Sequence, residues 1–503
     1  MPASLSEGRL SQLADFVRTH LGLHFPPGRR GNLETGIRRA AGEFGFQDVE
    51  SCLDWLLSTT LEKSQVEVLA SHLTVGETYF FRDRNSYRVL EESVLPPLIQ
   101  ARSMGERRLR IWSAACATGE EPYTLAMVVK KLIPDQSDWN ITILGTDINP
   151  RVLEKAARGT YSRWSFRDVP AGTVERFFRS AGDDRWEVLP EIRRMVTFSY
   201  LNLILDSYPA LLNGTNAMDV IFCRNVIMYF SEDGQRHVIG NLHQCLLDGG
   251  WLAVSGCEGF QIPFSKFVPV NFPDAIFYRR DSRRVERTED LAVAGALLHP
   301  PVFQTVKPVL VDSPPNPPAA PIPPTSKERR AAGSPADLYL QAVALFERGR
   351  YQSAVESILG LVPGGPNDVR ALVLLTRIYA NQGRLVEALG WCERAIVEDK
   401  VDPGTRFFHA AILQELGRVE EAKKSLRQAI YLDGEFVMAH YAMANLALRE
   451  GDEREAARSF RVALQLLDRY DADARPRDSE GLTAGRLTEI IRTITKRRTG
   501  DAG

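Results

Sequence analysis

Residues 109–127, LRIWSAACATGEEPYTLAM, indicate how the central part of this chain folds. The apolar residues 109–115 suit a buried β-strand, and the run from Glu120 onward suits a helix. Pro122 fits the first turn of that helix, where the backbone N–H groups have no partner within the helix. Small residues between the two elements allow a ligand to approach the backbone closely. Glu120 and Glu121 would repel a phosphate, so this turn suits a cationic or hydroxyl-bearing ligand better.

Further strands and helices alternate after this segment. Apolar β-type runs follow at residues 141–148, 195–201, 219–230 and 249–256. This alternation predicts an α/β domain with a mainly parallel, doubly wound sheet and a ligand at the carboxyl ends of its strands. The runs 267–270 and 275–280 can close the sheet with antiparallel strands. Asp147 ends the second strand, where such domains often bind ribose hydroxyls through an acid, although an acid at a strand end is as often only a helix cap.

The region before this domain, up to about residue 90, has a helical pattern. One apolar face is marked by Leu33, Ile37, Ala40 or Ala41, and Phe44, and a second face by Val49, Leu53, Leu56 and Leu57. No strand is needed there, so we expect an all-α domain.

A proline-rich stretch and a set of repeats follow the α/β domain. Residues 299–325 contain ten prolines, which favour extended backbone and predict an interdomain linker. After it, Gly349, Gly383, Gly417 and Gly451 are each separated by 34 residues. This is the period of tetratricopeptide (TPR) repeats, in which a turn joins two antiparallel helices. Small residues keep the same spacing and allow these helices to pack closely: Ala354, Ala388, Ala422 and Ala456, then Ala395, Ala429 and Ala463.

The composition excludes several other classes of protein. Of the 503 residues 44% are hydrophobic and 25% charged, and the formal net charge of −2 gives no general reason to bind nucleic acid or an anionic membrane. The six cysteines are scattered without the spacing of a metal site, so no metal is expected. No signal sequence or long apolar run is evident, and a cytoplasmic protein is therefore expected.

Four segments together resemble the chemotaxis receptor methyltransferase (CheR) family: LTVGETYFFRD (73–83), IWSAACATGEEPYTLAM (111–127), GTDINPRVLEKA (145–156) and IFCRNVIMYF (221–230). They occur in the family's order, and the resemblance covers residues 5–280. Family members often carry asparagine where this chain has Gly76, and the sequence G-H-S-E where this chain reads Gly256-Cys257-Glu258. These differences bear on individual contacts only.

The resemblance implies a Rossmann-like domain that binds S-adenosylmethionine and releases S-adenosylhomocysteine. It assigns cofactor contacts to Thr78, Arg82, Ala114, Glu120, Asp147, Asn202, Leu203, Arg224 and Asn225, and catalytic roles to Arg82 and Tyr229. Without the resemblance, we would expect Tyr229 and the pair Phe80-Phe81 to be core residues. A small β-subdomain is expected near residues 163–192, and Arg29, Arg30, Arg38 and Arg39 are candidates for a basic surface that docks on a receptor.

The sequence thus predicts five parts: a helical receptor-docking domain (1–90), a methyltransferase domain (91–283), a linker (284–334), four TPR repeats (335–470), and a capping helix with a tail (471–503). The implied reaction methylates glutamate side chains on the cytoplasmic domain of a methyl-accepting chemoreceptor. The repeats would bind a protein partner that the sequence does not identify. Two alternatives stay open: a ligand-sensing module that has lost its activity, and a methyltransferase for a small carboxylate.

Overall fold

The computed structural model of this chain describes residues 5–59, 61, 63–211, 213–256, 258, 266–273, 275–281, 335–359, 368–479 and 482–499. The chain divides into two compact units. The first joins Met1–Asp281 to Asn367–Gly503, and the second is Ser282–Pro366. The linker predicted at residues 284–334 lies outside the described residues.

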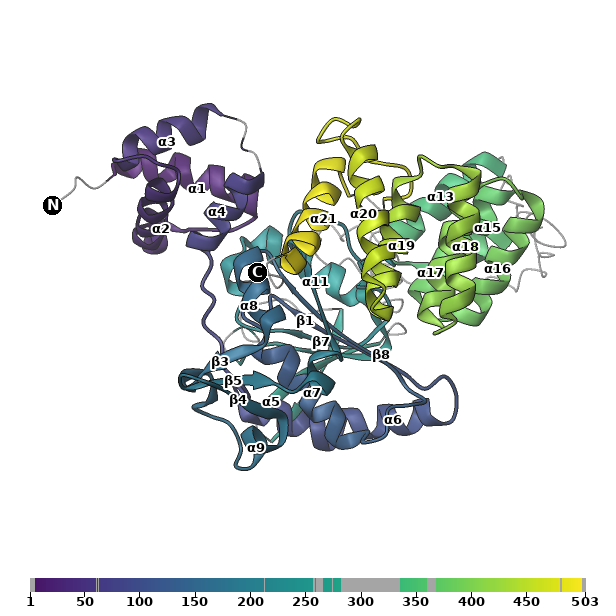
Figure 1. Cartoon of the computed structure of the whole chain (residues 1–503), viewed down its shortest axis with the longest axis horizontal. Coiled ribbons are helices and arrows are strands. Elements are labelled where there is room, and N and C mark those ends of the chain that lie inside the picture. Colours follow the sequence, from purple (N-terminus) through teal and green to yellow (C-terminus); the bar gives the residue numbers. More distant parts are fainter. Residues whose placement is uncertain are drawn as a thin grey trace, which may run out of the picture. The chain divides into compact units, whose positions relative to one another are not determined.

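The first unit begins with helices, as the sequence predicts (Figure 1). They are α1 (Glu7–Leu21), α2 (Arg30–Glu43), α3 (Val49–Ser58), α4 (Lys63–Leu73), α5 (Arg84–Val89), the π-helical turn η2 (Leu90–Val94) and α6 (Leu95–Ser103). Leu33 and Ile37 on α2 are fully buried, in agreement with their spacing. The assignment of Leu57 to the buried face of α3 is wrong, because this side chain is 39% exposed. Its neighbour Leu56 takes the core-facing position, and consecutive helical residues point in different directions.

A seven-stranded sheet forms the centre of the first unit, in the order β6-β2-β1-β7-β8-β10-β9. Its strands are β1 (Arg108–Ala114), β2 (Asn140–Asp147), β6 (Val196–Tyr200), β7 (Met218–Cys223), β8 (Leu246–Ala253), β9 (Phe267–Phe272) and β10 (Ala275–Arg280). The first five strands of this order are parallel, whereas β10 is antiparallel to both β8 and β9. Both the doubly wound sheet and its antiparallel closure are therefore confirmed.

Helices connect the parallel strands, and a smaller sheet is inserted between α8 and β6. The connecting helices are α7 (Glu120–Leu132), α8 (Pro150–Arg158) and α11 (Glu232–Cys245). The smaller antiparallel sheet has the order β3-β5-β4, with β3 (Thr160–Ser162), β4 (Phe178–Gly182) and β5 (Arg185–Val188). Three short helices lie in the same stretch of chain: η3 (Arg163–Phe166), α9 (Thr173–Phe177) and α10 (Pro190–Arg193). It lies where the sequence placed a β-subdomain.

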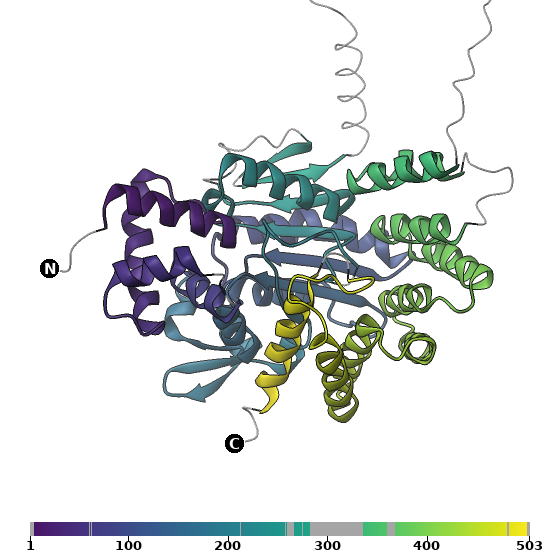
Figure 2. The ribbon, with the colours of Figure 1, turned by 90° about the horizontal axis from the view of Figure 1, so that it is seen from above.

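The C-terminal part of the first unit consists of paired helices that stack one pair after another (Figure 2). The pairs are α15 (Val369–Asn381) with α16 (Leu385–Glu398), α17 (Pro403–Glu415) with α18 (Val419–Leu432), and α19 (Val437–Glu450) with α20 (Glu453–Leu467), followed by α21 (Ala484–Thr499). Gly383, Gly417 and Gly451 occupy the turn within each pair, with φ between 72° and 81°. Glycine adopts this left-handed conformation without the steric cost of a Cβ, which explains the 34-residue spacing.

The second unit contains one more helix pair among its described residues, α13 (Pro335–Glu347) and α14 (Tyr351–Leu359). Gly349 forms the same turn, with φ 72°, and Ala354 is fully buried. The sequence period and the helix pairing therefore agree in this unit too.

Five cysteines lie in the described parts of the chain, and all are buried and free: Cys52, Cys116, Cys223, Cys245 and Cys392. Burial raises the pKa of each thiol above its ordinary value. None of the described helices combines the length and the apolar character needed to cross a membrane.

Candidate active site

Neighbouring loops meet at one edge of the large sheet. Strands β1, β2 and β7 are parallel, so their carboxyl ends and the loops that follow lie together. The segment before α5 joins them, because the Arg224 guanidinium donates a hydrogen bond to the carbonyl oxygen of Arg82 (2.8 Å). The structure therefore brings most of the predicted site residues to a single edge.

The backbone of these loops is strained. Five non-glycine residues there have positive φ: Phe81 (59°), Asp83 (64°), Ala115 (60°), Ala117 (47°) and Asn225 (57°). Each such residue costs on the order of 1–3 kcal/mol, and this kind of strain gathers at ligand sites. Such strain cannot be read from residue type, since nothing about alanine or phenylalanine signals a left-handed conformation.

Asp147, at the end of β2, is a buried carboxylate with two backbone donors. Its Oδ2 accepts from the Ala117 N–H (2.9 Å) and its Oδ1 from the Asn149 N–H (2.8 Å). Burial raises its pKa to about 6, and these hydrogen bonds only partly oppose that shift. Each carboxylate oxygen has a second lone pair, so Asp147 can still accept hydrogen bonds from two neighbouring hydroxyls.

Glu120 is the first residue of α7 and is 3% exposed. Its carboxylate accepts hydrogen bonds from the hydroxyls of Thr118 (2.6 Å) and Ser165 (3.0 Å). Burial raises its pKa as well. Ala114, which ends β1 just before this loop, is fully buried. Two acidic acceptors beside small residues fit the hydroxyls and the ammonium group of S-adenosylmethionine, which carries no phosphate.

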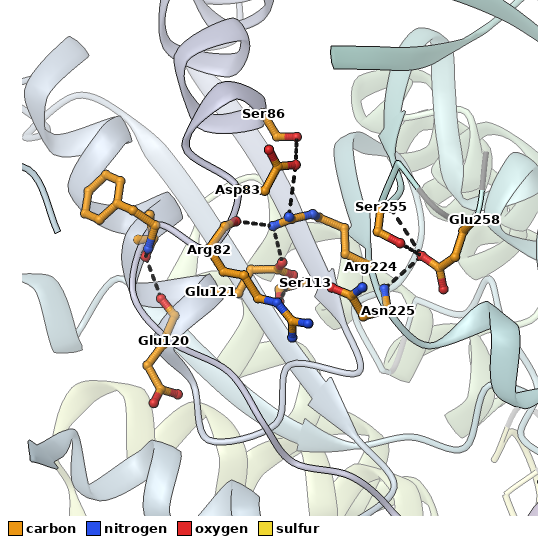
Figure 3. Close-up of polar contacts among 12 residues, drawn as sticks. Arg82, Asp83, Ser86, Ser113, Glu120, Glu121, Arg224, Asn225, Ser255 and Glu258 are labelled. Atoms are coloured by element: carbon orange, nitrogen blue, oxygen red, sulfur yellow. Dashed lines mark hydrogen bonds and ion pairs between the residues drawn. The ribbon is translucent and has the colours of Figure 1, made fainter. Parts of the chain in front are cut away.

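Arg224, directly after β7, is the buried centre of an ion-pair network (Figure 3). Its guanidinium lies 3.1 Å from the Asp83 carboxylate and 3.4 Å from that of Glu121. Glu121 in turn accepts a hydrogen bond from Ser113 in β1 (2.8 Å). Arg224 therefore ties the segment bearing Arg82 to the strands beneath it. Asp83 and Glu121 were not among the predicted contacts, although both adjoin residues that were.

Glu258 organises the loop after β7. Its carboxylate accepts hydrogen bonds from the backbone N–H groups of Asn225 (2.8 Å) and Ile227 (2.9 Å), and also from Ser255. Glu258 is 2% exposed. It holds Asn225 in its strained conformation just before the turn η4 (Ile227–Tyr229). The sequence reasoning missed this residue, because it treated Gly256-Cys257-Glu258 only as a departure from the family.

Tyr229, at the end of η4, is half-buried and contacts the N-terminal region. The Arg29 guanidinium lies 5.2 Å from the centre of its ring and donates a hydrogen bond to the Met228 carbonyl oxygen (2.6 Å). The His24 N–H donates to the carbonyl oxygen of Tyr229 (2.8 Å). The helical region therefore touches the loop that is expected to shape the methyl-transfer site.

The four arginines considered for receptor docking are in different situations. Arg29 packs on Tyr229, Arg30 pairs with Glu7 (2.5 Å) and Arg38 pairs with Glu34 (2.5 Å). Arg39 is exposed. The positive charge that this surface offers to a receptor is therefore smaller than the sequence suggests.

The remaining predicted residues are Thr78, Arg82, Asn202 and Leu203. Thr78 is half-buried, and Arg82 donates to the Glu77 carbonyl oxygen (2.8 Å). The Asn202 side chain donates to the Leu21 carbonyl oxygen (3.1 Å) and accepts from the Ile204 N–H (2.9 Å), so it links its own loop to the end of α1. Leu203 beside it is buried and can present an apolar surface.

Family models match both halves of the chain. The model described as CheR methyltransferase, SAM binding domain matches residues 76–271. Models of the tetratricopeptide repeat match residues 338–403 and 405–436.

Individual relatives match either part of this chain or most of it. Chemotaxis protein methyltransferase 1 of Pseudomonas aeruginosa is 37% identical over 217 residues, which cover 42% of this chain and 77% of the relative. The probable chemotaxis protein methyltransferase of Rhizobium etli is 37% identical over 194 residues, which cover 38% of this chain and 70% of the relative. The probable biofilm formation methyltransferase WspC of Pseudomonas aeruginosa is 27% identical over 88% of this chain and 95% of its own length. The chain therefore belongs to the CheR methyltransferase family and joins its methyltransferase domain to C-terminal TPR repeats.

Proposed function

We propose that this chain is a protein-glutamate O-methyltransferase, which acts in the cytoplasm on glutamate side chains of a methyl-accepting chemoreceptor-type protein. The observation that carries the proposal is the pair of buried acceptors, Glu120 and Asp147, at the carboxyl edge of a family-typical sheet. When bound there, S-adenosylmethionine supplies the methyl group, and S-adenosylhomocysteine is the product.

The chain's own residues bind and orient the reactants. Asp147 accepts hydrogen bonds from ribose hydroxyls, and Glu120 stabilises the cationic amino-acid end of the cofactor. Thr78, Ala114, Asn202 and Leu203 line the remainder of the cofactor site. Arg224 and Asn225 hold the loop after β7, through the contacts with Asp83, Glu121 and Glu258.

The acceptor carboxylate needs no catalytic base. A glutamate side chain has an ordinary pKa near 4.3, so it is already an ionised nucleophile at neutral pH. The enzyme's task is to align this carboxylate with the methyl group and to exclude water. We assign the orientation of the carboxylate to the Arg82 guanidinium and the shape of the methyl-transfer site to the Tyr229 ring.

Transfer of radiolabelled methyl from S-adenosylmethionine to the cytoplasmic domains of candidate chemoreceptors tests this proposal. Base-labile label on the receptor indicates a methyl ester, and Arg82→Ala should lose it. Arg88→Ala is the matched control, because Arg88 follows on α5 and its half-exposed side chain lies 3.7 Å from Glu92. It should leave transfer unchanged.

Other outcomes would point elsewhere. Cofactor binding without transfer to any receptor would favour a ligand-sensing module. Transfer to a small carboxylate but not to protein would favour a different acceptor. We also propose that the repeats bind a protein partner.

A further inference from the structure

The central strand β1 carries two buried arginines. Arg108 is 8% exposed and Arg110 is 1% exposed. Strands covered on both faces of a parallel sheet are usually continuous apolar runs. A charge removed from water there is strongly unfavourable unless it is paired. Both arginines lie in the half of β1 that is remote from the cofactor edge, so the site does not explain them.

The partner of Arg110 comes from the repeat array of the same compact unit. The Arg110 guanidinium forms an ion pair with Glu415, the last residue of α17, and donates a hydrogen bond to the Gly214 carbonyl oxygen (2.6 Å). Glu415 is only 12% exposed. Burial acts to raise the pKa of Glu415, but Arg110 and Arg108 outweigh this effect and lower it. Glu415 is thus held as a carboxylate between arginines.

Further contacts surround this ion pair. Asn140, at the start of β2, donates to the Glu415 carbonyl oxygen (2.7 Å), and Asn216, before β7, donates to the Ala380 carbonyl oxygen in α15 (3.3 Å). At Gly383 an added Cβ would lie 2.8 Å from the Leu247 side chain at the start of β8. The contact therefore involves the carboxyl ends of α15 and α17 and three strands of the sheet.

The position of Glu415 within its helix is unfavourable by itself. The carboxyl end of a helix carries partial negative charge, which disfavours an acid and favours a base. The equivalent positions one period earlier and later are Asn381 and Arg449, neither of which is acidic. Arg449 in the array also helps to lower the pKa of Glu415, but the ion pair that Glu415 forms is with Arg110 across the interface.

We propose that the carboxyl ends of α15 and α17 form a docking surface whose occupant is the methyltransferase domain of this same chain. Glu415 recognises the amino-terminal edge of the sheet through Arg110, with Arg108 beside it. The repeats are then fixed to the domain rather than free, and the cofactor edge at the other ends of the strands stays open. A protein partner that needs these helix ends must first displace the domain and expose Arg110.

Charge reversal in the full chain tests this inference. With the repeats independent, Glu415→Arg should leave the radius of gyration unchanged, because its repulsion from Arg449 stays within the array. With the docking surface, the same change places an arginine against Arg110 and Arg108 of the sheet as well. We then expect the melting temperature to fall by about 5 °C or more and the radius of gyration from small-angle X-ray scattering to increase.

Two further variants complete the test. The double reversal Arg110→Glu with Glu415→Arg should restore both values, at least in part, because the ion pair is re-formed with opposite polarity. Glu398→Arg is the matched control, since Glu398 is likewise the last residue of a repeat helix, α16, but is exposed, and it should neither lower the melting temperature nor change the radius of gyration. A folded Glu415→Arg chain with an unchanged radius of gyration would overturn the proposal, whatever its melting temperature. So would a double reversal that folds, as judged by circular dichroism, yet stays expanded.

Discussion

Asp147 combines burial with a role that needs its charge. Burial raises its pKa to about 6, so the carboxyl takes up a proton when the pH falls below that value. The folded chain binds this proton more tightly than the unfolded chain does. For this group alone, folding stability therefore decreases as pH rises from about 4 to about 6. Binding of hydroxyl donors should depend on pH in the opposite direction, because the ionised form is the better acceptor.

We therefore expect the affinity for S-adenosylmethionine to weaken about tenfold between pH 8 and pH 5. Isothermal titration calorimetry across this range measures the effect directly. The Asp147→Asn chain should bind more weakly at pH 8 and show a flat profile, because its amide does not titrate. A profile that keeps its slope in this variant would assign the titration to another group, such as Glu120.

The stability of the folded chain should depend on the Arg224 side chain, which pairs with two carboxylates. Removal of the guanidinium by Arg224→Ala leaves Glu121, whose side chain is 13% exposed, without its buried cationic partner. The free energy of unfolding should fall by about 3–5 kcal/mol, as measured by urea denaturation. Arg236→Ala on α11 is the control: that side chain is 56% exposed and pairs with Asp233 at the surface, so a change within about 0.5 kcal/mol is expected. Equal losses in both variants would contradict a special role for the buried network.

At the scale of elements, the turn glycines of the repeats offer a clean test of backbone conformation. Gly417 has φ 74°, and an added Cβ would meet nothing within 4 Å. Gly417→Ala should therefore cost about 1 kcal/mol through the left-handed backbone alone. Gly434→Ala is the control, because Gly434 is not among the positive-φ glycines and its Cβ would approach only the Ile430 carbonyl oxygen, at 3.9 Å. Urea unfolding followed at 222 nm distinguishes the two variants, and equal stabilities would show that the turn tolerates a side chain.

Elements set by local chemistry could be predicted from the sequence, whereas contacts between distant elements could not. The repeat helices followed from the glycine and alanine period, and Asp147 followed from its place at a strand end. Arg224 and Asp83 are 141 residues apart, and Arg110 and Glu415 are 305 residues apart. No periodicity links such pairs. The Asn202 side chain likewise bonds to Leu21, 181 residues away, a contact that its residue type does not predict.

At the scale of the whole molecule, the proposed chemistry and the proposed docking make separate demands on the chain. Every residue assigned to the site lies between Thr78 and Glu258, so a chain shortened to residues 1–281 should still transfer methyl groups. The same chain lacks Glu415, and its melting temperature should be lower than that of the full protein because Arg110 loses its partner. Initial rates of label transfer and thermal denaturation measure the two effects. A folded but inactive short chain would show that the repeats contribute to catalysis.

The buried cysteines give each part of the first unit its own chemical probe. Cys52 lies in the N-terminal helices, Cys116, Cys223 and Cys245 lie in the methyltransferase domain, and Cys392 lies in the repeats. The thiolate is the form that reacts with alkylating reagents, and both burial and a raised pKa suppress it in the folded chain. Pulsed alkylation followed by mass spectrometry would therefore record local opening events thiol by thiol. The order in which these thiols become labelled would show which part of the protein opens most readily, without any engineered label.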